Sequence, residues 1–168
     1  MSTITTSREV IPSGTWAVDP VHTTIGFQVT DTADLYSTIN GRFVEFEGRV
    51  VGGEQPSLAG TIRVESIRTD NDQRDAHLAS PDFLDAANHP EIRFESTAVE
   101  PVDAERFRLR GRLFVKDTPF EVELEGRIRA RGQGKAGDER LVLDVRGSFE
   151  WGTTTVEINA AVSTSKDA

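Results

Sequence analysis

Apolar and polar side chains alternate with a period of two along most of this chain, and this pattern constrains the fold more than any other feature. A period of two is that of a β-strand with one buried face and one wet face. In the clearest stretch, 107–115, apolar residues and a glycine alternate with arginines. The same alternation predicts strands at 25–29, 44–50, 58–64, 92–98, 107–115, 120–128, 141–151 and 156–160, with Trp16 and Val18 beginning the first strand before Pro20 interrupts it.

Short turn-forming segments separate these strands. Residues 52–57, 101–105, 116–119 and 132–139 are rich in glycine, proline and aspartate, which are the residues that turns favour. Connections this short join antiparallel neighbours, because a parallel neighbour needs a crossover of about a dozen residues or more. About eight amphipathic strands in a row therefore predict an all-β fold, either an up-and-down barrel or a sandwich.

The turn at 117–118 predicts the register of one hairpin. If these two residues form the loop, Arg112 lies opposite Glu123 and Arg110 lies opposite Glu125. Opposite charges then face each other on the wet side of the sheet. This favours a solvated charged face over an anion-binding stripe.

Two large aromatic residues fall on the wet face of the predicted strands. They are Phe43 and Phe114, and exposed aromatic side chains of this size often mark contacts between proteins. We therefore expect a homodimer that uses a sheet face with at least one of them. The alternative is that a lid or a terminal segment of the same chain covers both.

One segment, 66–90, breaks the strand pattern and carries helix signals. Ser80, Pro81 and Asp82 have the form of an N-cap, a first-turn proline and an acidic first turn. We expect one or two short helices here, lying across a barrel end as a plug or lid. The remaining expectations are an irregular loop at 31–40, a single domain at 14–162 and flexible tails at 1–13 and 163–168.

Composition excludes several classes of function. The 168 residues carry a formal net charge of -9, which repels nucleic-acid phosphates and anionic lipid surfaces, so no nucleic-acid partner is expected. The chain has no cysteine, which excludes disulfides and thiolate metal sites. No stretch approaches the ~20 apolar residues of a membrane helix, and the N-terminus does not read as a secretory signal. We expect a cytoplasmic protein without a membrane span.

The histidines are the first candidates for chemistry. Asp19, His22, Asp75 and His77 could hold a metal ion, but they lack the close spacing that zinc ligands usually show. Structural roles are favoured instead: we expect Arg74, Asp75 and His77 to make hydrogen bonds that fix the lid to the barrel, and His22 to tie down the start of a strand. The sequence shows no nucleophile elbow and no glycine-rich phosphate loop, so we expect no cofactor and no catalytic residues. An enzyme that uses His22, His77 and nearby carboxylates for metal-assisted or hydrolytic chemistry remains the alternative.

Glycines on the apolar faces suggest space inside the fold. Gly48, Gly60, Gly111, Gly126 and Gly147 all occupy inward positions, where they either let the sheet coil tightly or leave room for a guest. An eight-stranded barrel can hold a small ligand, and an apolar wall favours an apolar one. The predicted lining residues are Phe27, Phe46, Ile62, Phe83, Phe94, Leu109, Leu113, Leu124, Leu143 and Phe149. A large residue such as tryptophan at position 111 should block the cavity, whereas a barrel filled solid would indicate a protein-interaction module.

Several motifs resemble those of the YceI family of lipocalin-like proteins. The segment W-A-V-D-P-V-H-T-T-I-G-F at 16–27 is similar to the opening motif of that family, and N-G-R-F at 40–43 to one of its turns. The strongest match is S-I-R-T-D-N-D-Q-R-D-A-H-L-A-S-P-D-F-L-D at 66–85, followed by H-P-E-I-R-F-E-S-T at 89–97. The hairpin at 111–122 also fits.

This resemblance implies an eight-stranded antiparallel up-and-down barrel with a short helical insertion at about 66–90. It also implies a pocket for a long isoprenoid tail, with quinone-like and prenyl-phosphate-like molecules as the ligand class. The leading hypothesis is thus a carrier, buffer or storage protein for such a molecule. The sequence departs from the family pattern at Thr30 and Asp31, where a histidine is common, and at Ser148, where an arginine is common.

Overall fold

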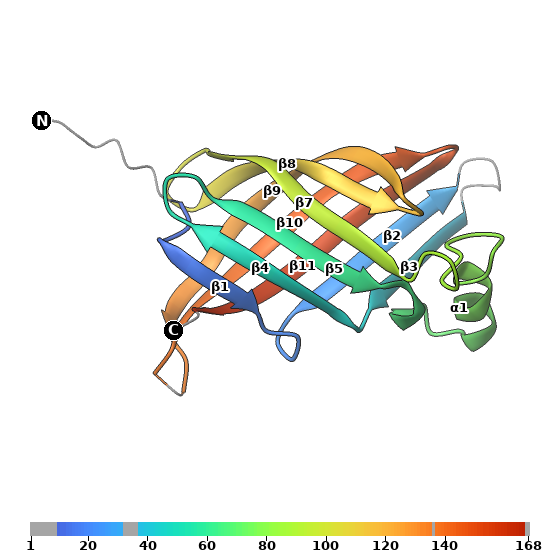
Figure 1. Cartoon of the computed structure of the whole chain (residues 1–168), viewed down its shortest axis with the longest axis horizontal. Helices are drawn as coiled ribbons and strands as arrows, with labels where there is room; N and C mark the ends of the chain where they lie inside the picture. Colours follow the sequence, from blue (N-terminus) through green and yellow to red (C-terminus); the bar gives the residue numbers. More distant parts are fainter. Residues whose placement is uncertain (1–9, 32–36, 136, 167–168) are drawn as a thin grey trace, which may run out of the picture.

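The chain forms a closed, eight-stranded antiparallel β-barrel with a short helix at one end (Figure 1). The computed structural model describes residues 10–31, 37–135 and 137–166. Three barrel strands are interrupted and consist of two segments each, so eleven segments make up eight strands. The segments are β1 (Gly14–Val18) with β2 (Thr24–Asp31), β3 (Ser37–Phe43) with β4 (Phe46–Gly52), β5 (Ser57–Arg63) with β6 (Ile67–Arg68), then β7 (Glu91–Pro101), β8 (Arg106–Val115), β9 (Thr118–Gln133), β10 (Glu139–Trp151) and β11 (Thr154–Lys166).

The barrel closes because β11 pairs with both segments of the first strand. Ala17 of β1 pairs with Ser165, and Phe27 of β2 pairs with Ile158. Every other strand pairs with its neighbours in the sequence, so the connectivity is up-and-down, as the alternating strands and short turns predict. Closure covers most strand edges, although the short segment β6 pairs with β3 alone.

The hairpin between β8 and β9 has a different register from the predicted one. Its loop is 116–117, where both residues have a positive φ, of 52° and 61°, as a tight type I′ turn requires. Arg112 therefore lies opposite Glu121, and Arg110 lies opposite Glu123. The predicted Arg112–Glu123 and Arg110–Glu125 pairs are wrong by two residues.

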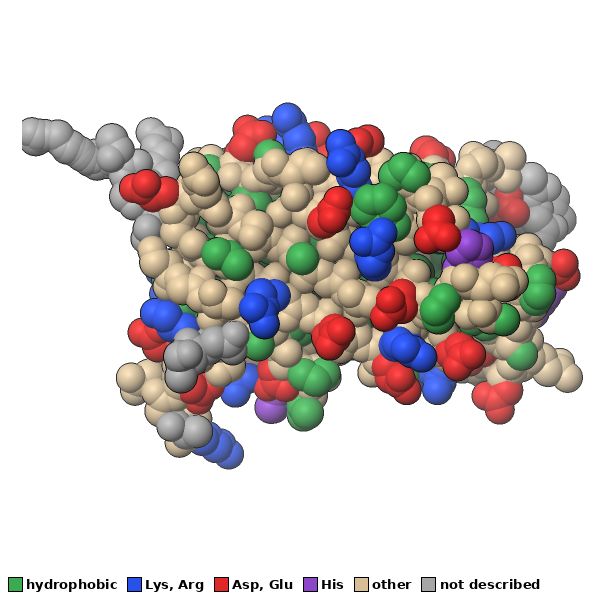
Figure 2. Space-filling model, viewed as in Figure 1, with side chains coloured by type: hydrophobic (Ala, Val, Ile, Leu, Met, Phe, Trp, Pro, Cys, Tyr) green, Lys and Arg blue, Asp and Glu red, His purple; other side chains and the backbone are tan. Residues whose placement is uncertain are grey.

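A shift of two residues preserves the faces of both strands. Leu113 and Leu124 are buried as predicted, and the arginines of β8 point outward to carboxylates. Arg112 Nε lies 3.2 Å from Glu121 Oε1. Acidic and basic side chains are interspersed over the barrel wall in the view of Figure 2, which agrees with a solvated charged face.

Two irregularities move residues from one face to the other. A bend at 44–45 separates β3 from β4, so Val44 is 43% exposed rather than inward. Phe43 turns inward instead, and its ring centroid lies 5.2 Å from that of Phe27. Its predicted place on the wet face is wrong. A bulge between Ser96 and Ala98 likewise puts Val99 against the core in place of Ala98.

The N-terminal segment closes the barrel end opposite α1 (Asp72–Leu78). Val10 and Ile11 are fully buried, and Gly53 N donates a hydrogen bond of 2.9 Å to Ile11 O. Residues 10–11 fall within the predicted N-terminal tail at 1–13, and their apolar side chains pack into the core. At the other terminus β11 continues to Lys166, past the predicted boundary. Residues 1–9 and 167–168 of the predicted tails lie outside the described residues.

The helical insertion is present but begins at a different cap. The Asn71 side chain accepts a 3.0 Å hydrogen bond from Arg74 N at the first turn of α1. Ser80 begins no helix. Its Oγ donates to His77 O at 2.6 Å, and 80–85 forms turns. The predicted irregular loop at 31–40 is also corrected, since β3 begins at Ser37, while 32–36 lies outside the described residues.

Candidate functional site: an apolar cavity inside the barrel

A cavity of about 690 Å³ occupies the barrel interior. Apolar side chains from all eight strands and from the insertion dominate its wall. The predicted residues that line it are Phe27, Phe46, Ile62, Phe83, Phe94, Leu109, Leu113, Leu124 and Phe149. Leu143 does not, because it is 0% exposed and lies in the packed core beyond the end of the cavity. The volume is in the range that holds a drug-sized ligand, about 300–1,000 Å³.

A layer of fully buried side chains ends the cavity at the N-terminal side. Along β10 the cavity touches Phe149 and Val145 but not Leu143, and along β11 it touches Val162 but not Thr164. On β8 the cavity reaches Leu109 and stops before Phe107. We call this layer the floor; its members are Ile11, Trp16, Phe107, Ile128, Leu141 and Leu143.

Three of the inward glycines leave no free space. A Cβ at Gly126 would lie 2.2 Å from the ring of Phe107, and one at Gly147 would lie 2.3 Å from Leu124 Cδ2. A Cβ at Gly111 would meet both the Phe94 ring and a backbone oxygen at 2.6 Å. At these three positions a neighbouring side chain already occupies the space in which a Cβ would lie. A tryptophan at position 111 would therefore disrupt packing rather than fill the cavity as expected.

The other two inward glycines form a bare patch in the cavity wall. Gly48 and Gly60 pair directly between β4 and β5. A Cβ at Gly60 would meet only backbone, with Glu47 O at 3.2 Å. The flanking residues 47–49 and 59–61 also line the cavity, which indicates that the backbone itself faces the interior here. A Cβ at Gly48 would lie 3.0 Å from Val18 Cγ2, so it is Gly60, which no side chain covers, that leaves room in the wall.

Polar residues gather where α1 meets the barrel. Arg74 and His77 of α1 line the cavity together with the turn residue Phe83, which is 43% exposed. The β2 and β11 ends contribute Asp31 and Thr154 at the same end of the barrel (Figure 1). The insertion thus covers the cavity end that lies away from the floor.

Hydrogen bonds hold α1 in this position. Asp75 Oδ1 accepts from both Thr69 N (2.8 Å) and Thr69 Oγ1 (2.6 Å). Arg74 Nη2 donates to Thr69 O at 2.6 Å. Both side chains therefore tie the helix to the segment that follows β6. His77 contributes no such bond; its ring packs edge-on against Phe83 with centroids 4.8 Å apart.

Each histidine has its own aspartate partner. His22 Nδ1 lies 2.7 Å from Asp19 Oδ2, and His89 Nδ1 lies 3.2 Å from Asp117 Oδ2. His77 Nε2 lies 3.8 Å from Asp82 Oδ2. Within the described part of the chain, no three potential metal ligands of the His, Cys, Asp or Glu type lie together. The structure does not bring His22 and His77 into one site.

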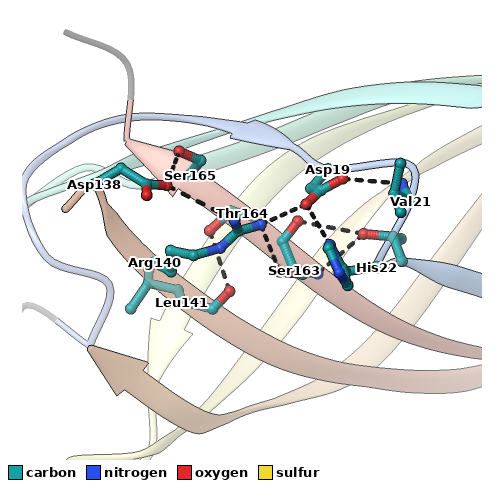
Figure 3. A network of polar contacts seen from close by, with 10 residues as sticks. Asp19, Val21, His22, Asp138, Arg140, Leu141, Ser163, Thr164 and Ser165 are labelled. Atoms are coloured by element: carbon teal, nitrogen blue, oxygen red, sulfur yellow. Dashed lines mark hydrogen bonds and ion pairs between the residues drawn. The ribbon is translucent and has the colours of Figure 1, made fainter. Parts of the chain in front are cut away.

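Asp19 joins the first strand to the end of the barrel sheet (Figure 3). It lies between His22 and Arg140, and it accepts hydrogen bonds from His22 Nδ1, Arg140 Nη2 and Val21 N. The bonds from His22 and Arg140 hold the pKa of the Asp19 carboxyl well below its usual range. Arg140 Nη2 also bonds to Ser163 Oγ at 3.3 Å, so this network fixes the interruption between β1 and β2 against β10 and β11.

The fold and the cavity define a class of protein: a closed antiparallel barrel with an apolar interior large enough for a ligand. The YceI-like domain family matches residues 16–166, nearly the whole chain, and the chain belongs to this family. Protein YceI of Escherichia coli O6:H1 is 29% identical over 133 residues, which cover 77% of this chain and 68% of that protein. The resemblance seen in the sequence motifs is confirmed.

Solved structures share the fold. BcnA of Burkholderia cenocepacia superimposes with a TM-score of 0.72 at 17% identity, covering 87% of this chain and 98% of that chain. A polyisoprenoid binding domain from Saccharophagus degradans has a TM-score of 0.63 at 12% identity, covering 90% and 98%. At such identities the likeness shows the architecture alone. Among the described residues, no helix is long and apolar enough to cross a membrane.

Sequence reasoning missed several residues that shape the cavity. Phe43 was placed outside because nothing in the local pattern marks the bend at 44–45. The floor residue Ile11 was assigned to a tail, although the apolar pair 10–11 just before Pro12 was a usable signal. Arg74 and His77 were assigned as anchors, and their place beside the cavity follows only from the docking of α1.

Proposed function

We propose that this protein binds a linear apolar molecule, of the isoprenoid or prenyl-quinone class, inside the barrel and acts as its carrier, buffer or storage protein. The observation that carries the proposal is the cavity of about 690 Å³ with an almost wholly apolar wall. A void of that size costs packing contacts unless an apolar guest occupies it. The Saccharophagus degradans domain of the same fold, which carries the description polyisoprenoid binding, supports this ligand class.

The polar end of the ligand belongs at the α1 end of the cavity. Arg74 and His77 line that end, whereas the floor is made of buried apolar residues. A polar head group placed at the floor would lose its hydrogen bonds to water without replacement, which is costly. The tail therefore points to the floor and the head to α1.

The direct test is to extract the purified protein with organic solvent and to identify the extracted lipid by mass spectrometry, beside a titration with a prenylated quinone. We expect an apolar lipid in the extract and saturable binding of the quinone. The blocking variant is Gly60→Leu, because its side chain enters the cavity at the bare patch. We expect affinity to fall by about tenfold or more, with overpacking costing about 1–3 kcal/mol of stability.

The matched control is Gly132→Leu. Gly132 lies on the exposed part of β9, and a Cβ there meets nothing within 4 Å, so the same substitution should leave binding unchanged. A protein that yields no lipid and binds no quinone would contradict the proposal. Equal loss of binding in both variants would show that Gly60→Leu acts through folding, not through the cavity.

The two other candidate functions have less support. A barrel that serves only as an interaction scaffold has no need of a cavity this large. A hydrolytic or metal-assisted enzyme would need its groups to converge, but His22 and His77 contact different partners and lie on different elements.

A further inference from the structure

We infer that the floor limits the ligand to a tail of about four or five isoprene units, so that any longer tail leaves part of its length outside the barrel. This inference rests on the proposed function and specifies the class of tail. It follows from three features of the structure: the volume of the cavity, the packing of the floor, and the attachment of the N-terminal segment that supports it.

The volume sets the scale. A carbon-sized group and a water molecule in the liquid occupy similar volumes, about 30 Å³ each. The cavity of about 690 Å³ therefore holds ~23 such groups. Geranylgeraniol and geranylfarnesol have about this number of carbons. Solanesol has about twice as many and exceeds the available volume.

The floor leaves no passage for a longer tail. Leu143 is 0% exposed and Phe107 and Leu141 are 1% exposed. The Phe107 ring lies against Gly126, and the ring fills the space that this inward glycine would otherwise leave empty. Side chains this closely packed admit an extra methylene group only at a cost. The cavity therefore ends at this layer.

The N-terminal segment, which contributes Ile11 to the floor, is held in place by hydrogen bonds. Ile11 is 0% exposed, and its carbonyl accepts the bond from Gly53 N. The carbonyl oxygen of the next residue, Pro12, accepts a hydrogen bond of 3.1 Å from Trp16 Nε1. Gly52 is needed for this approach, since a Cβ there would collide with Pro12 O. The N-terminal segment is thus fitted into the barrel end rather than laid across it.

The test is to measure the affinity of the full chain for a graded series of all-trans prenols: farnesol, geranylgeraniol, geranylfarnesol and solanesol. Each isoprene unit that enters the cavity should raise affinity by about tenfold or more. The gain should stop at geranylgeraniol or geranylfarnesol, with solanesol within about twofold of the longest prenol that fits. Affinity that continues to rise steeply to solanesol would overturn the limit while leaving the carrier function supported. Failure to bind any prenol would instead remove the proposed function.

A floor variant tests the cause of the limit. Leu143→Ala removes three carbons of a side chain at the end of the cavity, which is part of an isoprene unit, and should raise the affinity for the prenol just above the limit. Leu143→Val, a smaller change, serves if the alanine variant does not fold, and it should raise the affinity for the prenol just above the limit. The control is Val64→Ala, because Val64 is equally buried but does not line the cavity or belong to the floor. The same rise in affinity in the control would overturn the assignment of the limit to the floor.

Discussion

At the scale of single residues, the Asp19 network makes the stability of the fold depend on pH. Asp19 is the acceptor for His22, Arg140 and Val21 at the point where the first strand is interrupted. The lowered pKa of its carboxyl means that the folded state favours the ionised form. The network therefore stabilises the fold wherever the carboxyl is charged in both the folded and the unfolded chain.

The sign of the pH dependence follows. Because the folded pKa lies below the unfolded value of 3.8, the stabilisation is fully present above about pH 4. It is lost progressively as the pH falls from there toward the folded pKa. We expect Asp19→Asn to lower the urea midpoint of unfolding at pH 7, and the difference from wild type to shrink at about pH 3. A difference that is the same at both pH values would contradict an electrostatic role for Asp19.

At the scale of elements, Thr69 is the main hydrogen-bonding partner of the α1 side chains. Its groups make two bonds with Asp75 and two with Arg74. The helix has only seven residues and none of them is buried, and Leu78 at its end packs against the core. The bonds to Thr69 therefore act together with this packing to hold α1 beside the cavity.

Asp75→Ala should lower the free energy of unfolding by about 1–3 kcal/mol, because it leaves the partly buried Thr69 groups without their acceptor. Asp72→Ala is the matched control. Asp72 lies exposed in the first turn of the same helix, so its loss should cost less than about 0.5 kcal/mol. Urea unfolding measures the free energy of unfolding of both variants. Equal effects of the two substitutions would show that helix charge rather than the Thr69 bonds matters.

At the scale of the whole molecule, the predicted homodimer now rests on Phe114 alone. Phe43 lines the interior and cannot form an outer contact. Phe114 points outward from β8, and the guanidinium of Arg93 lies 4.6 Å from its ring centroid. This covers part of the ring within one chain, but the cover comes from the neighbouring strand β7 and not from the lid or terminal segment that the alternative to a dimer expects.

We keep the dimer as a prediction with a defined outcome. Light scattering at micromolar protein should return the mass of two chains, and Phe114→Ala should return the mass of one. Gly132→Leu, which alters another exposed strand position, should leave the mass unchanged. A monomer mass for the wild type would refute the dimer and assign Phe114 to its contact with Arg93.

Much of the wall could be predicted because the face of a strand residue is a local property. Because side chains alternate between the two faces of a strand, one residue known to face inward predicts that the residue two positions later also faces inward. This is why Leu109, Leu113 and Leu124 were assigned correctly. The turns at 52–57 and 101–105 also follow from local residue preferences, and up-and-down pairing follows from short turns. The sequence by itself determined the antiparallel strands, their apolar faces and most of the residues that face inward, and the resemblance of its motifs to a known family favoured a barrel over a sandwich.

Only the tertiary structure decided where that interior is empty. Whether an inward glycine leaves space depends on a side chain from another strand: the Phe107 ring covers Gly126, but no side chain covers Gly60. The depth of the cavity depends on the N-terminal segment that fills the barrel end, and Phe43 faces inward because a bend interrupts the alternation. These outcomes are set by contacts between residues far apart in the chain, which a pattern of near neighbours does not contain.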